Sequence, residues 1–133
     1  MQVKRFGVSL EEDILKSLDK YVKQKQFPNR SQAIRHLIRK NIVEEQWKGN
    51  NIVAGAVVLV YDHHKRELQT KSTRVQHDFH NLILSIQHVH LDHDNCLETI
   101  AVKGKAKELI KLANSLIAIK GIKHGKLVMS TII

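Results

Sequence analysis

Cysteine and proline are almost absent from the sequence, which has 133 residues and contains one of each. The single cysteine, Cys96, excludes an intramolecular disulfide and favours a reducing compartment. No apolar run is long enough to cross a bilayer as a helix, and the N-terminus lacks the apolar core of a signal peptide. These absences predict a soluble, cytoplasmic protein that makes no membrane contact.

Acidic residues are scarce relative to basic ones, with 13 Asp and Glu against 22 Lys and Arg. The resulting formal net charge of +9 favours a polyanionic partner, with nucleic acid as the first candidate. Apolar residues make up 42% of the chain, which is enough to build a folded core. Histidine is the residue in unusual supply, because 9 are present and most of them cluster in the second half.

The N-terminal segment predicts one strand followed by two helices. Residues 3–10 alternate between polar and apolar side chains, which is typical of a short β-strand. Ser9 followed by Glu12 predicts a capping box, so a first helix is expected directly after the strand. A second amphipathic helix is expected to be capped by Asn29 or Ser31.

The segment Trp47–Asn51 is the expected linker, since it lies between the last helical pattern and a strongly β-like run. It separates a first domain, residues 1–47, from a second domain, residues 52–133. The second domain is expected to contain, in order, a strand at 52–61, a helical stretch at 62–76, strands at 82–91 and 96–103, a helix opening at Gly104 and ending at Gly121, and a strand at 124–133. This βαββαβ order is the ferredoxin-like pattern and places the chain in the α+β class.

A lone strand and two helices cannot bury their apolar faces, and such a strand leaves both backbone edges open. Pairing two copies across a two-fold axis gives a two-stranded ribbon that fits the major groove of DNA. Three apolar side chains would then turn inward: Phe6, Val8 and Leu10. Three others would face the bases: Arg5, Gly7 and Ser9. The start of the second helix would offer N–H groups to a phosphate at Asn29, Arg30 and Ser31. An ordinary edge strand beside a solvated basic helix remains the alternative.

Two histidines and the cysteine converge on one predicted hairpin. His88 and His90 are two apart on a strand and share a face, and the turn at residues 92–95 brings Cys96 back beside His90. Opposed side chains in a hairpin lie about 5 Å apart, so the three could share one metal ion. Two imidazoles and a thiolate suit a borderline transition metal and not magnesium or calcium. A buried structural cysteine beside a surface histidine pair is the alternative.

Two sets of residues resemble known families. The stretch Asn29-Arg30-Ser31-Gln32-Ala33-Ile34-Arg35 resembles the ribbon-helix-helix family. His77, then His88-Val89-His90, then Asp94-Asn95-Cys96-Leu97-Glu98 resemble the nickel-responsive transcriptional regulators, the NikR family, along the whole chain. The resemblance implies a ribbon-helix-helix domain followed by an ACT-type domain, assembled as a homotetramer (a dimer of dimers). It implies planar four-coordinate Ni²⁺ held by His88, His90 and Cys96 of one subunit and His77 of a neighbour.

The same resemblance implies roles for residues around the metal and the DNA. Lys65 and Arg66, at the start of the helical stretch that ends near His77, would reach DNA phosphates once nickel orders that stretch. Residues expected to support the ligand side chains are Gln76, Glu98 and Tyr61. The sequence departs from the family at three positions: Gly7 replaces a hydroxyl residue, and Gln32 and His36 stand where relatives often have carboxylates that bind a cation between the domains.

The resulting hypothesis is a nickel-dependent regulator that binds a double-stranded DNA operator and represses genes of nickel uptake or nickel metabolism. The alternative is a ribbon-helix-helix regulator whose ACT-type domain senses an amino acid or another small molecule. A nickel buffer without an operator is a further possibility. No enzyme is expected, because no convincing general base stands beside an open metal position. His63 and His64 are candidates for an auxiliary metal site, with a polar loop pair as the alternative, and His80 and His93 for weak binding of excess metal.

Overall fold

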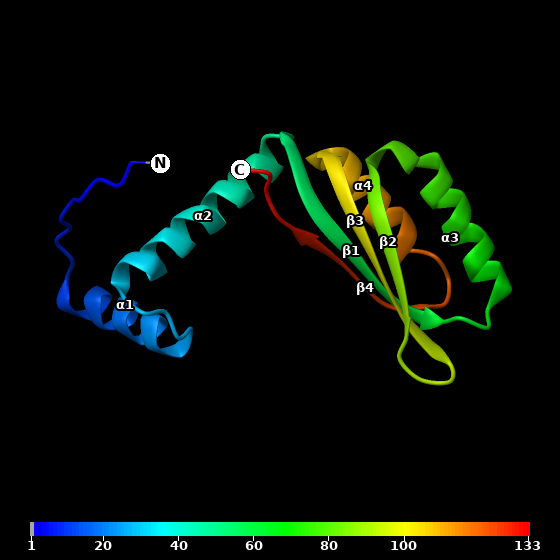
Figure 1. Ribbon diagram of the computed structural model, residues 1–133, viewed down its shortest axis with the longest axis horizontal. Helices are drawn as coiled ribbons and strands as arrows, with labels where there is room; N and C mark the ends of the chain where they lie inside the picture. Colours follow the sequence, from blue (N-terminus) through cyan, green and yellow to red (C-terminus); the bar gives the residue numbers. More distant parts are fainter. Residues whose placement is uncertain (1) are drawn as a thin grey trace. The chain divides into compact units, whose positions relative to one another are not determined.

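The computed structural model describes residues 2–133, and the chain divides into two compact units (Figure 1). The first unit ends at Asn41 and the second begins at Ile42. Helix α2, Arg30–Lys48, belongs to both, because its N-terminal part lies in the first unit and its last turns lie in the second.

The first unit contains helix α1, Glu12–Gln24, and most of α2. The strand expected at residues 3–10 does not form: these residues are exposed and carry no regular secondary structure. A strand is defined by hydrogen bonds to a neighbouring strand, and residues 2–41, the described part of the first unit, supply no second strand. The expectation of a strand is therefore wrong for one chain, and pairing between copies is a separate question.

The sequence predicts the N-terminal cap of α2 correctly but not that of α1. The capping box is wrong, because α1 begins only at Glu12 and its N-cap residue is Glu11, whose side chain makes no capping bond. Ser9 lies outside the helix, and Glu12 and Asp13 instead place negative charge in the first turn, where the helix dipole favours it. The cap of α2 is confirmed, since the Asn29 Oδ1 accepts the N–H of Gln32 at 2.9 Å.

Helix α2 continues two residues into the expected linker, so Trp47 and Lys48 are helical. Trp47 is buried in the core of the second unit, and its indole N–H donates to the carbonyl of Ser130 at 2.9 Å. The chain between α2 and the first strand is reduced to Gly49–Asn51. An aromatic residue with a distant partner thus extends the helix beyond the point where its apolar period ends.

The second unit is a four-stranded antiparallel sheet with two helices, in the order β2-β3-β1-β4. The expected βαββαβ order is confirmed, with a short 3₁₀ turn inserted at His80–Leu82. The elements are β1 Ile52–Asp62, α3 Arg66–Asp78, β2 Ile83–His90, β3 Asn95–Lys105, α4 Ala106–Ile117 and β4 Ile122–Met129.

Gly104 does not open the fourth helix as expected, because it lies within β3. Helix α4 begins at Ala106, and its first N–H groups are capped by the linker. The carbonyl of Asn51 accepts the N–H of Ala106 at 3.0 Å, and the Asn50 Oδ1 accepts the N–H of Lys107 at 2.9 Å. The expected end at Gly121 is late, because α4 ends at Ile117; Gly121, with a φ of 103°, lies in the turn that leads from α4 to β4.

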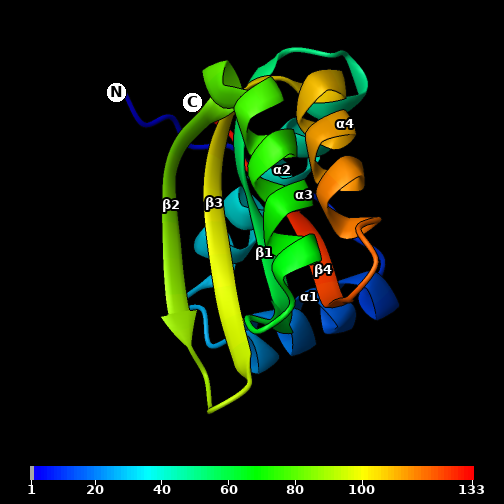
Figure 2. The same cartoon turned by 90° about the vertical axis from the view of Figure 1, so that its right-hand side faces the viewer.

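Helices α3 and α4 lie side by side over one face of the sheet (Figure 2). Alternate residues of β1 and β3 are buried beneath them, and α4 approaches β4 so closely that a Cβ at Gly125 would lie 2.5 Å from the Ile117 side chain. No helix of the second unit covers the opposite face in the described residues, and large apolar side chains remain exposed there, including Val89 and Val128. Within residues 2–133, no helix is long and apolar enough to span a membrane.

Candidate metal centre and nucleic-acid interface

The β2–β3 hairpin places the predicted ligands on one face of the sheet. His90 pairs directly with Cys96 and His88 with Glu98, and residues paired across an antiparallel ladder project to the same side. This is the face that α3 and α4 cover over the central strands. The rings of His88 and His90 are stacked with centroids 5.5 Å apart, and both side chains are exposed because β2 is the edge strand.

Cys96 lies under this pair and is fully buried. Its thiol donates to the carbonyl of Tyr61 at 3.5 Å, a distance within reach for sulfur. Burial raises the pKa of the Cys96 thiol, and the nearby carboxylates of Glu98 and Asp62 raise it further. The thiol is therefore protonated in the metal-free protein, and a metal ion would have to displace its proton to gain the thiolate.

Next to the cysteine, the buried carboxylate of Glu98 joins three elements. One of its oxygens accepts the hydroxyl proton of Tyr61 on β1, and the other accepts the Gln76 side-chain N–H from α3 at 2.8 Å. The same Gln76 amide group donates to the Ser72 hydroxyl at 3.1 Å. Burial, followed by the Glu98 carboxylate, raises the pKa of Tyr61 well above its usual value. Of the three residues that the sequence predicts to support the ligands, Tyr61 and Gln76 thus both contact Glu98 directly.

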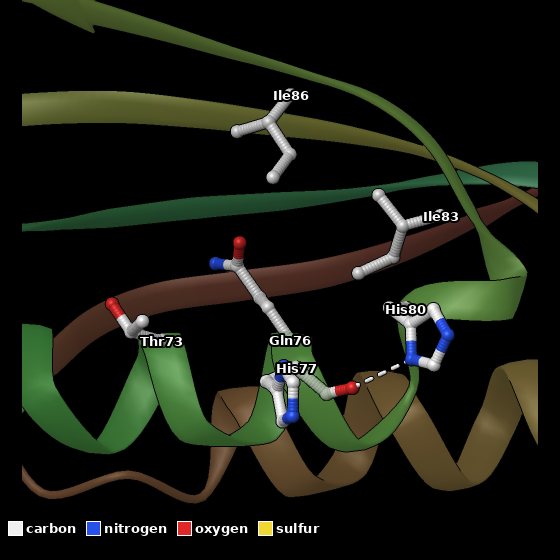
Figure 3. A pocket seen from close by; sticks show the side chains of 6 residues that line it. All are labelled: Thr73, Gln76, His77, His80, Ile83 and Ile86. Atoms are coloured by element: carbon white, nitrogen blue, oxygen red, sulfur yellow. Dashed lines mark hydrogen bonds between the residues drawn. The ribbon is translucent and has the colours of Figure 1, made fainter.

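His77 lies in the last turn of α3, next to Gln76. It lines an open pocket between α3 and β2, with Ile83 and Ile86 on the strand side (Figure 3). Gln76 points from the helix toward the strands, whereas the His77 carbonyl accepts a bond from the His80 ring at 2.9 Å. The imidazole of His77 is exposed and is not gathered with those of His88 and His90.

The predicted quartet is therefore only partly assembled within one chain. The structure brings His88, His90 and Cys96 to one end of one hairpin face and leaves His77 on a different element. Among residues 2–133, only His64, His93 and Asp94 bring three ligand atoms within 4.8 Å of one another. The donor set of the hairpin nevertheless fits a borderline transition metal, because two accessible imidazoles lie beside a thiol and leave coordination positions open.

The predicted DNA contacts fall in three places. Arg5, Gly7 and Ser9 are exposed in the N-terminal segment without regular structure, and Ser31 is exposed in the first turn of α2. Lys65 is the N-cap residue of α3, where Arg66 is the first residue, and both are exposed. All of these residues are accessible to a polyanion.

Arg30 is the exception, because its guanidinium is already paired within the chain. It donates from Nε and Nη2 to the two oxygens of Asp19 on α1, at 2.8 and 2.9 Å. The hydrogen bond from Arg30 holds the pKa of the Asp19 carboxyl below its usual value. Sequence analysis missed this pair, and the only signal available was an acidic residue on one helix and a basic residue at the start of the next.

The two units together define a class of protein. Two short N-terminal helices joined to an α+β domain that carries candidate metal ligands fit the architecture of a metal-dependent transcriptional regulator. The sequence profile of ribbon-helix-helix proteins of the copG family matches residues 4–45. The profile of the NikR C-terminal nickel-binding domain matches residues 54–130. The chain belongs to the nickel-responsive regulator family, which is a family of transcriptional regulators and not of enzymes.

Whole-length relatives agree with these matches. A protein of Syntrophus aciditrophicus named as a nickel-responsive regulator is 52% identical over 95% of this chain and 92% of its own length. A protein with the same name from Desulfotalea psychrophila is 49% identical over 97% of this chain and 95% of its own length. Among solved structures, an uncharacterized protein from Thermotoga maritima superposes with a TM-score of 0.54 at 15% identity, covering 59% of this chain and 98% of that one, which shows a shared fold alone.

Proposed function

We propose that the protein is a nickel-dependent, DNA-binding transcriptional regulator that acts in the cytoplasm as a repressor of genes for nickel uptake or nickel metabolism. The observation that carries this function is the hairpin register, which sets His90 opposite Cys96 and His88 on the same face, inside the segment matched by the nickel-binding domain. We assign DNA binding to residues 1–47, of which residues 42–47 belong structurally to the second unit, and metal binding and tetramer assembly to residues 52–133. Family membership favours nickel over the alternative of an amino-acid sensor.

The metal ligands we assign are His88, His90 and Cys96 of one subunit and His77 of a neighbouring one. Bound Ni²⁺ would supply fixed bonds between the two subunits. The chain's own residues prepare the site: Glu98 holds the Gln76 amide, and thereby fixes the last turn of α3 beside His77. Tyr61 donates a hydrogen bond to the other oxygen of the Glu98 carboxylate, and the two bonds together hold the hairpin and the end of α3 in a fixed relative position.

A homotetramer is supported by two separate apolar surfaces. In the first unit, Ala33 is the only fully buried apolar residue among those described, and Phe6, Val8 and Leu10 are exposed. Pairing two N-terminal segments into a ribbon would cover these three residues. In the second unit, the uncovered sheet face offers a different surface. Two distinct self-complementary contacts lead from a pair of chains to a dimer of dimers.

DNA binding then combines base and phosphate contacts. Arg5 and Ser9 of the paired ribbon face the major groove, and the first turn of α2 binds a phosphate. Gly7 between them has no side chain for a base contact. Lys65 and Arg66 contribute phosphate contacts from the start of α3, whose far end carries His77. Fixing His77 in a neighbouring subunit restrains the whole helix and places both cations.

The test is a binding titration with DNA fragments selected from a random pool by the nickel-loaded protein. Fluorescence anisotropy at one stated salt concentration should show tight binding with one Ni²⁺ per chain and much weaker binding without it. Cys96→Ala should lose both the thiolate-to-nickel charge-transfer absorption and the nickel-dependent DNA binding. His124→Ala, which changes an exposed histidine on β4, is the matched control. Nickel-independent binding, or full nickel response in Cys96→Ala, would contradict the proposal.

A further inference from the structure

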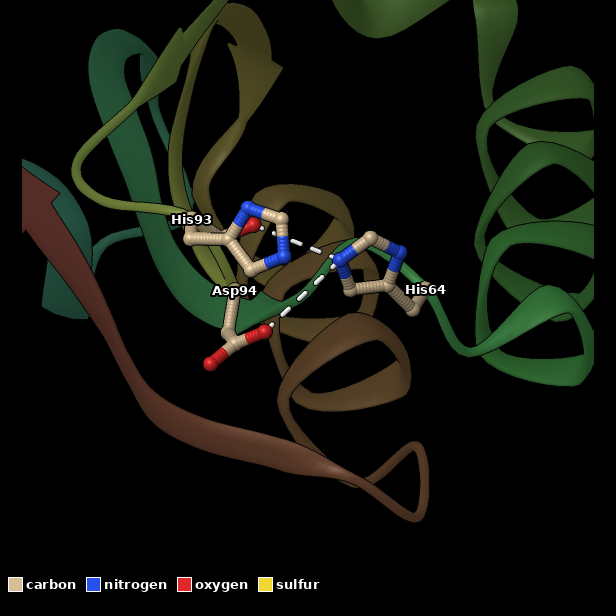
Figure 4. Close-up of side chains that lie close together, drawn as sticks. All are labelled: His64, His93 and Asp94. Carbon is tan, nitrogen blue, oxygen red and sulfur yellow. Dashed lines mark hydrogen bonds and ion pairs between the residues drawn. The ribbon is translucent and has the colours of Figure 1, made fainter.

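A second group of metal-binding side chains lies where the loop between β1 and α3 meets the turn between β2 and β3. His64 comes from the loop, and His93 and Asp94 come from the turn (Figure 4). One ligand atom from each of the three lies within 4.8 Å of the other two. None of these residues belongs to the set His77, His88, His90 and Cys96.

The geometry leaves room for an ion among these side chains. The His64 Nε2 lies 3.7 Å from the Asp94 Oδ1 and 3.3 Å from the carbonyl oxygen of His93. The rings of His64 and His93 have centroids 5.6 Å apart. All three side chains are exposed, so water can fill the remaining coordination positions and a metal ion can reach them from solvent.

Both backbone segments are held in place before any ion binds. The Asp62 Oδ1 accepts the His64 N–H at 2.9 Å, and the Asp92 Oδ1 accepts the N–H groups of Asp94 at 2.9 Å and Asn95 at 2.7 Å. The N–H of His63 donates to the carbonyl of Asp94 at 3.1 Å and ties the loop to the turn. Little loop entropy would therefore be lost when a metal ion bridges the two segments.

His63 is not the partner of His64 in this group, although the two were paired as an auxiliary site from the sequence. The Nε2 atoms of both rings lie near the His93 carbonyl, but His63 makes the shorter hydrogen bond, at 2.8 Å against 3.3 Å for His64, and the His63 ring also packs against His90 at a centroid distance of 4.6 Å. Asp94, which sequence analysis did not select, supplies the carboxylate instead. Charge near the group is mixed, because the ammonium group of Lys123 lies near the carboxylates of Asp62 and Asp92 and donates to the Asn95 Oδ1.

We propose that His64, His93 and Asp94 form a second metal site that takes a divalent late transition-metal ion such as Zn²⁺. Two imidazoles and one carboxylate with water in the open positions form a common donor set for this class of ion. The absence of a thiolate makes it chemically different from the hairpin site. The ion would fasten the start of α3 to the β2–β3 turn.

The experiment uses the full chain loaded with one Ni²⁺ per subunit and titrated calorimetrically with Zn²⁺. One further ion per chain should bind. Replacing a direct ligand should cost at least as much as replacing a residue that only orients one, which is about 10–100-fold in affinity. His64→Ala and His93→Ala should each weaken zinc binding by at least that factor, whereas the control His124→Ala should leave it unchanged.

Two results would overturn the second site. One is equal zinc affinity in the native chain, His64→Ala and His93→Ala. The other is zinc uptake that only displaces nickel, seen as loss of the thiolate-to-nickel absorption with no additional ion bound. The same titration on Cys96→Ala separates this proposal from the proposed nickel function, because that variant should lose nickel and keep the zinc site.

Discussion

At the scale of single residues, the polar groups buried beneath the hairpin are satisfied by one another. Glu98 accepts hydrogen bonds from Tyr61 and Gln76, and it is the only buried charged side chain among the described residues. A buried carboxylate that loses a donor keeps its desolvation penalty without the compensating bond. Tyr61→Phe should therefore destabilise the second unit by about 1–3 kcal/mol. Urea unfolding followed by circular dichroism measures the change, and Tyr21→Phe, in the first unit, serves as the control.

A second residue-scale prediction concerns the exposed pair of Asp19 and Arg30. Asp19→Asn removes one negative charge and frees the Arg30 guanidinium for a DNA phosphate. The slope of log affinity against log salt should become steeper by roughly one unit, with tighter binding at low salt. Because Arg30 lowers the pKa of Asp19, the pair persists at neutral pH and is lost as pH falls through that lowered pKa. An unchanged slope in Asp19→Asn would show that Arg30 does not reach the DNA.

At the scale of elements, the short connection between α2 and β1 is held in place because one of its residues, Asn50, caps helix α4, which lies far away in the sequence. Asn50 has a positive φ of 53°, and its side chain caps the first turn of α4. Asn50→Gly should lose only the cap, whereas Asn50→Ala should lose the cap and also strain the backbone, adding about 1 kcal/mol or more. Unfolding midpoints should fall in the order native, Asn50→Gly, Asn50→Ala. Equal midpoints for the two variants would show that the left-handed conformation carries no cost here.

The elements that could be predicted from sequence are those governed by local periodicity. The alternation of β1 and β3 and the helical spacing of α4 appear directly in the residues, and the structure places them within a few positions of expectation. The errors lie at helix and strand boundaries that are set by a residue far away in the sequence. Trp47 extends α2 because its indole meets Ser130, and Gly104 stays in β3 because Asn50 and Asn51 start α4 after it.

The candidate site follows the same division. A two-residue period and one short turn were enough to place His88, His90 and Cys96 on the same face of one hairpin, whereas their joint role as ligands stays a prediction. The bond between Gln76 and Glu98 joins a helix to a strand 22 positions away, and no local pattern predicts it. Asp94 lies beside His64 for a similar reason, since the loop and the turn meet only in the folded sheet.

At the scale of the whole molecule, the proposed tetramer would assemble through two surfaces with different functions, and a carboxylate introduced on each surface can separate those functions. Phe6→Asp places a charge on the face that two ribbons would bury, so it should halve the mass of the assembly and abolish DNA binding while nickel binding persists. Val128→Asp charges the open sheet face on β4, at the opposite edge from the hairpin, and should also halve the mass, but it should weaken nickel binding because His77 of the neighbour is lost. Sedimentation velocity, nickel titration and DNA anisotropy distinguish the two variants.

Asn114→Asp, at an exposed position on α4, is the matched control and should change neither the mass, nor the nickel affinity, nor the DNA binding. Native mass in both variants would refute the assignment of these surfaces, and nickel affinity unchanged in a half-sized Val128→Asp would show that all the ligands come from within the remaining chains.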